Sequence, residues 1–175
     1  MKFPFLYQFI LVVTLVFYGS SSSVAQVKQD SGFKVKGFHL DLRIQVMTPN
    51  ALKAFAKELS ELGINTLVME YEATYPFKKH ATIANEYAYT RGEIEDFITY
   101  CNNLGIEVIP LQQSLGHLEY ILRNPRYSAL KEDRKDISQV CPMQIEESKR
   151  LFSELFADMA ATHNSDYIHI GGDET

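Results

Sequence analysis

The order of apolar segments is the feature that most restricts how this chain can fold. Four short runs have the length and composition of β-strands, and they span residues 37–42, 65–70, 106–111 and 167–170. The segments between them carry apolar residues at every third or fourth position, which is typical of one face of a helix. This alternation of strands and helices predicts right-handed βαβ units and a parallel sheet.

The ends of the expected helices carry recognisable signals. The first helix follows Thr48 and Pro49 and stops at Gly63. Threonine is a good N-cap, proline fits the first helical position, and glycine readily adopts the left-handed conformation that ends a helix. The second helix opens with a capping box formed by Thr90 and Glu93.

A third long helix is expected over residues 143–162, just before the last strand. The chain would then hold about four βα units of an α/β fold. Four such units fit a small open sheet, and they also fit the first half of an eight-stranded (β/α)8 barrel. Composition and periodicity do not separate these two architectures.

The N-terminus has the layout of a secretory signal peptide. Lys2 gives it a basic start, residues 9–17 are almost wholly apolar, and Ser23 and Ala25 are small residues of the kind that precede a cleavage site. We therefore expect a signal peptide at 1–25 that is cleaved after Ala25, and a secreted or periplasmic protein. The alternative is a membrane anchor, but the apolar run is short for a bilayer span. No stable membrane span is expected after cleavage.

Charge and cysteine content argue against two other classes of protein. The formal net charge is −5, whereas nucleic-acid-binding domains usually carry a basic excess, so no nucleic-acid partner is expected. The two cysteines are Cys101 and Cys141. Cys101 occupies an apolar position of a helical pattern and is predicted to be a buried structural thiol. Two cysteines without a nearby histidine do not indicate a metal site, and no cofactor is expected.

Chemically active side chains concentrate where the expected strands end. In parallel α/β folds, the groups of the active site gather at the carboxyl ends of the strands. The candidates in this chain, in order, are Asp41, Glu72, His117, Asp173 and Glu174. Together they predict an acid-rich site.

The adjacent acids Asp173 and Glu174 are the most informative candidates. Gly171 and Gly172 precede them and allow a tight turn close to a ligand. Two neighbouring carboxylates repel each other when both are ionised, which raises the pKa of one of them. That group can act as a general acid while its ionised neighbour stabilises positive charge, a division that suits glycoside hydrolysis.

Adjacent acids do not flank a sugar from opposite faces, as the usual pair of glycosidase carboxylates does. They favour a mechanism in which the substrate supplies its own nucleophile. A solvated Asp-Glu turn is the alternative interpretation of the dipeptide taken alone.

The longer string HIGGDE resembles the H-x-G-G-D-E signature of glycoside hydrolase family 20, the β-N-acetylhexosaminidases. The resemblance covers residues 36–175 and is strongest to the hexosaminidase D-like branch. The other matching segments, in order, are HLDLR, EYEATYPF, YAYTRGEIEDFITYCNNLGIEVIPL, QSLGHLEYIL and CP.

This resemblance implies a (β/α)8 barrel that removes terminal β-linked N-acetylglucosamine or N-acetylgalactosamine with retention. It identifies Glu174 as the general acid/base and Asp173 as the residue that orients the acetamido group and stabilises an oxazolinium intermediate. It implies that His117 supports the acid and lines the sugar pocket, while Asp41 and Glu72 are placed to bind sugar hydroxyls. The expected partner is a glycan that contains N-acetylhexosamine.

The chain departs from the family pattern because it contains no tryptophan. Family members close the sugar pocket with aromatic residues from the second half of the barrel. We therefore expect a short linker at 26–35 and a partial catalytic barrel at 36–175, as an N-terminal fragment of a longer protein. We also expect the fragment alone to be inactive.

Two rival functions remain. A catalytically inactive sugar-binding barrel would use the same scaffold without needing a general acid. The GGDE string is also similar to the GGDEF motif of diguanylate cyclases, but Thr175 stands where phenylalanine would follow. Hydrolysis by the complete protein would exclude the first rival, and GTP binding would favour the second.

Overall fold

The computed structural model of the protein describes residues 32–172. Its sheet has three parallel strands in the order β1 (Gly37–Asp41), β2 (Thr66–Glu70) and β3 (Glu107–Leu111). The register pairs Asp41 with Glu70 and Glu70 with Leu111. The carboxyl ends of the three strands therefore lie level, which confirms the predicted parallel βαβ order.

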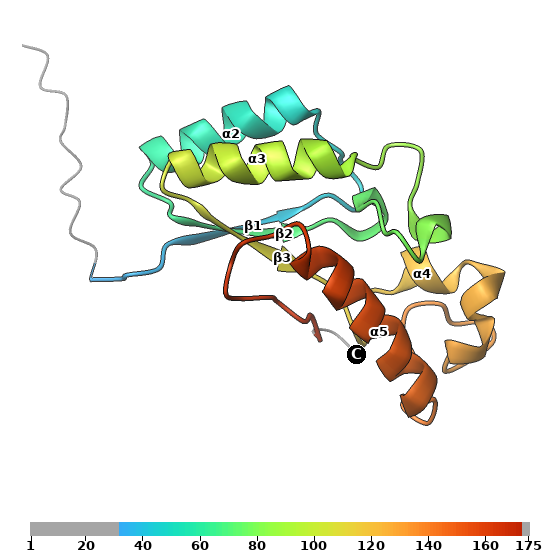
Figure 1. Ribbon diagram of the computed structural model, residues 1–175. Helices are drawn as coiled ribbons and strands as arrows, with labels where there is room; N and C mark the ends of the chain where they lie inside the picture. Colours follow the sequence, from blue (N-terminus) through green and yellow to red (C-terminus); the bar gives the residue numbers. More distant parts are fainter. Residues whose placement is uncertain (1–31, 173–175) are drawn as a thin grey trace, which may run out of the picture. The chain divides into compact units, whose positions relative to one another are not determined.

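Helices α2 (Pro49–Glu61) and α3 (Arg91–Asn103) lie side by side on one face of the sheet (Figure 1). Their ends are those that the sequence predicts. The side chain of Thr48 caps α2 by accepting a hydrogen bond from the backbone of Ala51, and Thr90 and Glu93 form the expected capping box of α3.

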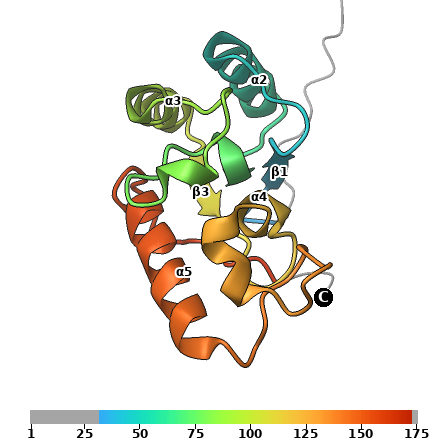
Figure 2. The ribbon, with the colours of Figure 1, turned by 90° about the vertical axis from the view of Figure 1, so that its right-hand side faces the viewer.

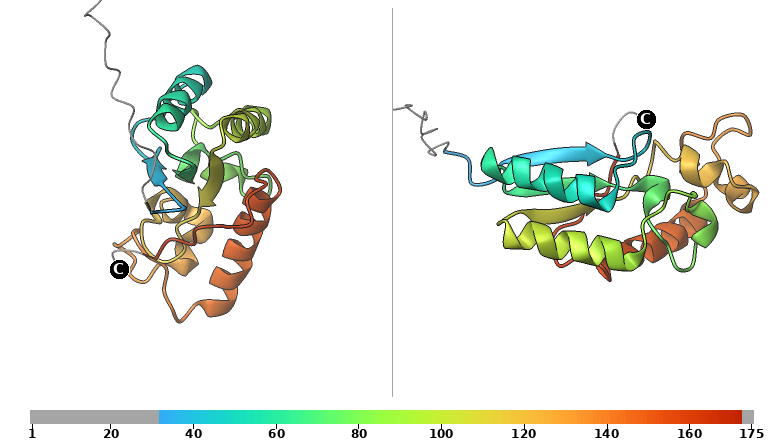
Figure 3. Two further views of the ribbon diagram at one scale, coloured as in Figure 1. Left: turned by 90° about the vertical axis from the view of Figure 1, so that its left-hand side faces the viewer. Right: turned by 90° about the horizontal axis from the view of Figure 1, so that it is seen from above.

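Helix α5 (Ile145–Ala160) follows β3 after a long connection. The end-on views place α2, α3 and α5 one after another around the outer side of the strands (Figures 2 and 3). The connection contains the short helix α4 (Glu119–Leu122) and the 3-10 turn η3 (Pro125–Leu130). Two further 3-10 turns, η1 (Glu72–Thr74) and η2 (Ala81–Ile83), lie between β2 and α3.

The predicted fourth strand at 167–170 is reduced to a single parallel bridge between Leu111 and His169. The backbone of His169 donates to Pro110 and accepts from Gln112, at 2.9 and 3.0 Å. The segment therefore lies in the place of a fourth strand beside β3, but only one residue pairs. The described residues hold three strands and this bridge, so the expected count of about four βα units is not confirmed.

The core lies between the sheet and its helices. Leu67 and Met69 of β2 are fully buried, as is Cys101 of α3, and burial raises the pKa of the Cys101 thiol to about 12. This confirms the prediction of a buried thiol. Within residues 32–172, no helix is both long and apolar enough to cross a membrane. The predicted signal peptide and its cleavage after Ala25 lie outside the described residues.

Candidate active site

Seven polar side chains gather at the carboxyl ends of the three strands. They come from the strand ends themselves and from the first residues of the loops that follow. They are Asp41, Arg43, Glu70, Glu72, Gln112, Gln113 and His117.

Arg43 joins the first and third of these loops. It donates to the Asp41 carboxylate from its Nη2 atom at 3.0 Å and lies 3.3 Å from Nδ1 of His117 through Nη1. A guanidinium has only donors, so Nδ1 of His117 is the accepting atom of this contact. His117 has a positive φ of 54°. This conformation is uncommon for a residue other than glycine, and it occurs more often at functional sites than elsewhere.

Glu72 is the most strongly perturbed acid of the site. It is 5 % exposed and has a positive φ of 46°. Burial raises the pKa of its carboxyl group to about 8; the nearby negative charge of Glu70 adds to the rise and the positive charge of Arg43 opposes it. A carboxyl group with this pKa is largely protonated at neutral pH and can donate a hydrogen bond.

Glu70 is buried at the end of β2 and is held from two sides. Its Oε2 atom accepts from Nε2 of His39 on β1, and its Oε1 atom accepts from Nε2 of Gln113 just after β3, both at 2.9 Å. These bonds tie the three strand ends together across the sheet. They also leave the Glu70 carboxylate with a partner on each oxygen, which buried charges require.

The Gly-Gly turn meets this network at Gln113. A Cβ atom built on Gly171 would lie 2.2 Å from Oε1 and 2.7 Å from Cα of Gln113, and Gly171 has a φ of +65°. The hydroxyl of Ser114 donates to the Ile170 carbonyl at 2.6 Å. Glycine is therefore required at 171 by both its conformation and its contact, and the chain continues from there into Asp173 and Glu174.

Three buried acceptor atoms at this end have no hydrogen-bond partner among residues 32–172. They are Oε1 of Glu72, Oε1 of Gln112 and Oε1 of Gln113. Buried polar atoms are seldom left without a partner, so this edge of the sheet is suited to a ligand with several hydroxyl or amide donors. The same range contains no cluster of three or more residues that could hold a metal ion.

The structure thus brings together three of the predicted site residues, Asp41, Glu72 and His117, around Arg43. Asp173 and Glu174 lie outside the described residues. Neither His39 nor Gln113 is among the site residues expected from the sequence. For Gln113, the available signal was a pair of glutamines directly after a buried strand.

A parallel α/β sheet with acids at the carboxyl ends of its strands is an architecture shared by many enzymes. Residues 58–175 match the model of the glycosyl hydrolase family 20 catalytic domain. Because this match covers more than half of the chain, the chain belongs to glycoside hydrolase family 20.

Individual relatives agree with this assignment. Human hexosaminidase D is 28% identical over 144 residues, which are 81% of this chain and 29% of that protein. Among solved structures, the Flavobacterium johnsoniae chitobiase superposes with a TM-score of 0.70 at 24% identity, over 81% of this chain and 24% of that one. The Streptomyces coelicolor β-N-acetylhexosaminidase gives 0.71 at 18% identity, over 82% and 33%. The chain therefore spans less than half the length of these relatives.

Proposed function

We propose that the protein is a retaining β-N-acetylhexosaminidase that removes terminal β-linked N-acetylglucosamine or N-acetylgalactosamine from glycans. The observation that carries the proposal is the contact of Gly171 with Gln113. Through it, Gly171 of the HIGGDE segment meets Gln113, which follows β3 and donates to Glu70 at the end of β2. Glu72 begins the turn η1 that follows β2. The proposed barrel is the (β/α)8 fold of the family, of which residues 36–175 are one part.

In the proposed reaction, Glu174 protonates the glycosidic oxygen as the leaving group departs. The carbonyl oxygen of the substrate's own acetamido group attacks the anomeric carbon, and Asp173 orients that group and stabilises the positive charge of the oxazolinium ring. Glu174 then removes a proton from water, which opens the ring with net retention. No enzyme nucleophile is needed, in agreement with two acids that are adjacent in sequence.

The described residues support binding roles for the other three candidates. Glu72, largely protonated near neutral pH, is able to donate to a sugar hydroxyl, and Asp41 is able to accept from one. His117 is joined through Nδ1 to the guanidinium of Arg43, which also binds Asp41, and its proposed role is to line the sugar pocket. These roles belong to the proposal.

The decisive experiment is an assay on aryl β-N-acetylglucosaminides and β-N-acetylgalactosaminides. Because the chain spans less than half of its relatives, both the native gene product and the 175-residue chain are assayed. Replacing Glu174 with glutamine removes the acid/base, and we expect a loss of about 100-fold or more in kcat. Glu132→Gln changes an exposed carboxylate and is the control.

Hydrolysis that survives in Glu174→Gln at the rate of the unmodified protein would reject the proposed role. Tight sugar binding by the native gene product without any hydrolysis would support the sugar-binding alternative. A thiazoline analogue of the oxazolinium ring should inhibit competitively, which separates the substrate-assisted mechanism from one that uses an enzyme nucleophile.

We also propose that the protein is exported. The support is the sequence layout of residues 1–25, and the test is the N-terminal sequence of the native protein, which should begin at Gln26. A mature protein that begins at Met1 would reject export by this route.

A further inference from the structure

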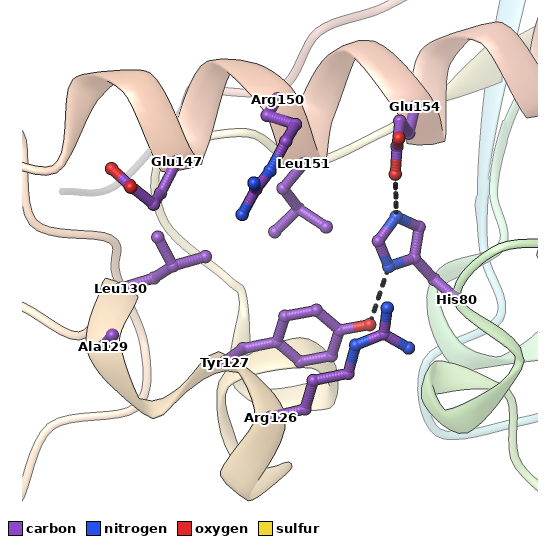
Figure 4. Close-up of a pocket in the computed structure, with 9 residues that line it drawn as sticks. All are labelled: His80, Arg126, Tyr127, Ala129, Leu130, Glu147, Arg150, Leu151 and Glu154. Carbon is purple, nitrogen blue, oxygen red and sulfur yellow. Dashed lines mark hydrogen bonds and ion pairs between the residues drawn. The ribbon is translucent and has the colours of Figure 1, made fainter.

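A cavity of about 460 Å³ opens between η3, the part of α5 from Glu147 to Glu154 and the loop that holds His80. Figure 4 shows side chains from these three segments pointing toward a common space. None of its lining residues belongs to the strand-end site. Its volume lies within the range of small-molecule sites, about 300–1,000 Å³.

His80 forms the base of the cavity and is hydrogen-bonded through both ring nitrogens. This residue is 5 % exposed, and its Nε2 and Nδ1 atoms lie 2.8 Å from the Glu154 carboxylate and 2.8 Å from the Tyr127 hydroxyl. Since a carboxylate only accepts, Nε2 of His80 donates to Glu154. Glu154 also accepts from Lys79, so its charge is already matched inside the protein.

Two guanidinium groups face the cavity from opposite walls. Arg126 comes from η3 and lies over the ring of Tyr127, with 5.6 Å between its Cζ atom and the ring centroid. Arg150 comes from α5, and Figure 4 shows it pointing into the space between Glu147 and His80. Neither arginine forms an ion pair within residues 32–172, and Glu147 is the only acid of the lining whose charge is not matched in that range.

The remaining wall is apolar. Leu130 and Leu151 are 5 % and 4 % exposed, respectively, and line the same cavity. They are able to contact the non-ionic body of a ligand while the guanidinium groups bind its charged group. An exposed pair of arginines on a flat surface would lack this buried base and wall.

We propose that this cavity is a second ligand site, which binds a small polyhydroxy molecule that carries an oxyanion group, as a sugar acid does. The planar guanidinium forks of Arg126 and Arg150 match the geometry of a carboxylate, sulfate or phosphate. Glu147 accepts hydrogen bonds from hydroxyl groups next to the oxyanion. The negative charge of Glu147 offsets only one of the two arginine charges. The cavity therefore carries a net positive charge and prefers an anionic group to a neutral one.

The test is a titration of the native protein with glucuronic acid, with inorganic sulfate and with neutral glucose, at constant ionic strength. The signals are the Nε–H resonances of the arginines and the methyl resonances of Leu130 and Leu151. We expect saturable shifts with glucuronic acid, weaker binding of sulfate, which lacks the hydroxyl groups, and none with glucose.

Arg126→Gln and Arg150→Gln should each weaken binding about tenfold, because each removes charge-assisted hydrogen bonds to the ligand. Arg123→Gln and Lys149→Gln are the matched controls, since each removes the same charge from an exposed position outside the lining. The controls should change the affinity less than twofold.

Four results would overturn the proposal. The first is the absence of saturable shifts with glucuronic acid and sulfate alike. The second is an equal loss of affinity in all four variants, which would show a diffuse charge effect. The third is equal affinity for glucose and glucuronic acid, which would make the site a neutral-sugar site. Sulfate binding as tight as that of glucuronic acid would restrict the site to simple anions and would also reject the sugar-acid ligand.

Discussion

Gly171 lies directly against Gln113, with a hypothetical Cβ atom only 2.7 Å from the Gln113 backbone. Gln113 in turn donates to the buried carboxylate of Glu70 at 2.9 Å. Gly171, which precedes Asp173 and Glu174 in the sequence, therefore contacts the hydrogen-bonded residues that join the strand ends. Glycine is needed at this first position of the GG pair because its φ is positive and because a larger side chain would overlap Gln113.

Replacement of Gly171 by alanine should reduce both activity and stability. The new methyl group must displace backbone at Gln113, and alanine is also disfavoured at a φ of +65°. We expect a loss of about 2–3 kcal/mol in the free energy of unfolding and a fall of about 100-fold in kcat, because a displacement of about 1 Å can cost this much. The measurements are urea unfolding and hydrolysis of an aryl β-N-acetylhexosaminide.

Gly105→Ala is the matched control for this variant. Gly105 has a similar φ of +75°, but nothing lies within 4 Å of its hypothetical Cβ. Gly105→Ala should lower the free energy of unfolding only by the cost of placing alanine at a positive φ, about 1 kcal/mol, and should leave kcat unchanged. Equal effects of the two substitutions would show that the contact with Gln113 is unimportant.

The carboxyl group of Glu72 should make the fold less stable as the pH rises. Its pKa is about 8 in the folded protein against an ordinary value of 4.5, so between these values the folded state binds more protons than the unfolded chain. By linkage, the free energy of unfolding falls as the pH rises from about 4.5 to about 8. Glu72→Gln should remove this decline and raise Tm relative to the unmodified protein at pH 8 more than at pH 5.

The measurement is Tm at several pH values for the unmodified protein, Glu72→Gln and Glu132→Gln, whose carboxylate is exposed. Parallel curves for the unmodified protein and Glu72→Gln would mean that Glu72 is ionised in the fold as readily as in the unfolded chain.

Protonation of His163 should make the fold less stable as the pH falls, whereas ionisation of Glu72 makes it less stable as the pH rises. Burial lowers the pKa of its imidazole to about 4 from 6.5. Nδ1 lies 3.0 Å from the Met159 carbonyl, which requires a donor, so Nε2 accepts from the hydroxyl of Tyr71 at 3.2 Å. A buried neutral imidazole binds fewer protons than the unfolded chain between these pH values, so stability is lost as the pH falls from about 6.5 to about 4.

His163→Gln should be less stable than the unmodified protein at pH 7, by about 1–2 kcal/mol for the lost hydrogen bonds. It should also lose less stability than the unmodified protein on going down to pH 4. Urea unfolding at fixed pH values measures both effects. An unchanged slope between pH 6.5 and 4 would contradict the buried neutral state.

Local sequence signals predicted most of the secondary structure. The capping box of Thr90 and Glu93 and the glycine at 63 place these helix ends within two residues, because caps and left-handed ends depend on residues close in sequence. The segment 167–170 was predicted as a full strand from its composition. Only His169 pairs there, since strand pairing depends on a partner elsewhere in the chain rather than on propensity.

The sequence by itself determined the order of elements, the family signature and the strand ends at which acidic residues occur. Only the tertiary structure decided how these groups interact: that Glu70 binds both His39 and Gln113, that Arg43 joins Asp41 to His117, and that His80 forms the base of a second cavity. Many of these pairs are separated by 31 to 74 residues. Their contacts arise from the packing of parallel strands and loops, and the raised pKa of Glu72 arises from burial. Neither property is encoded in any short stretch of the chain.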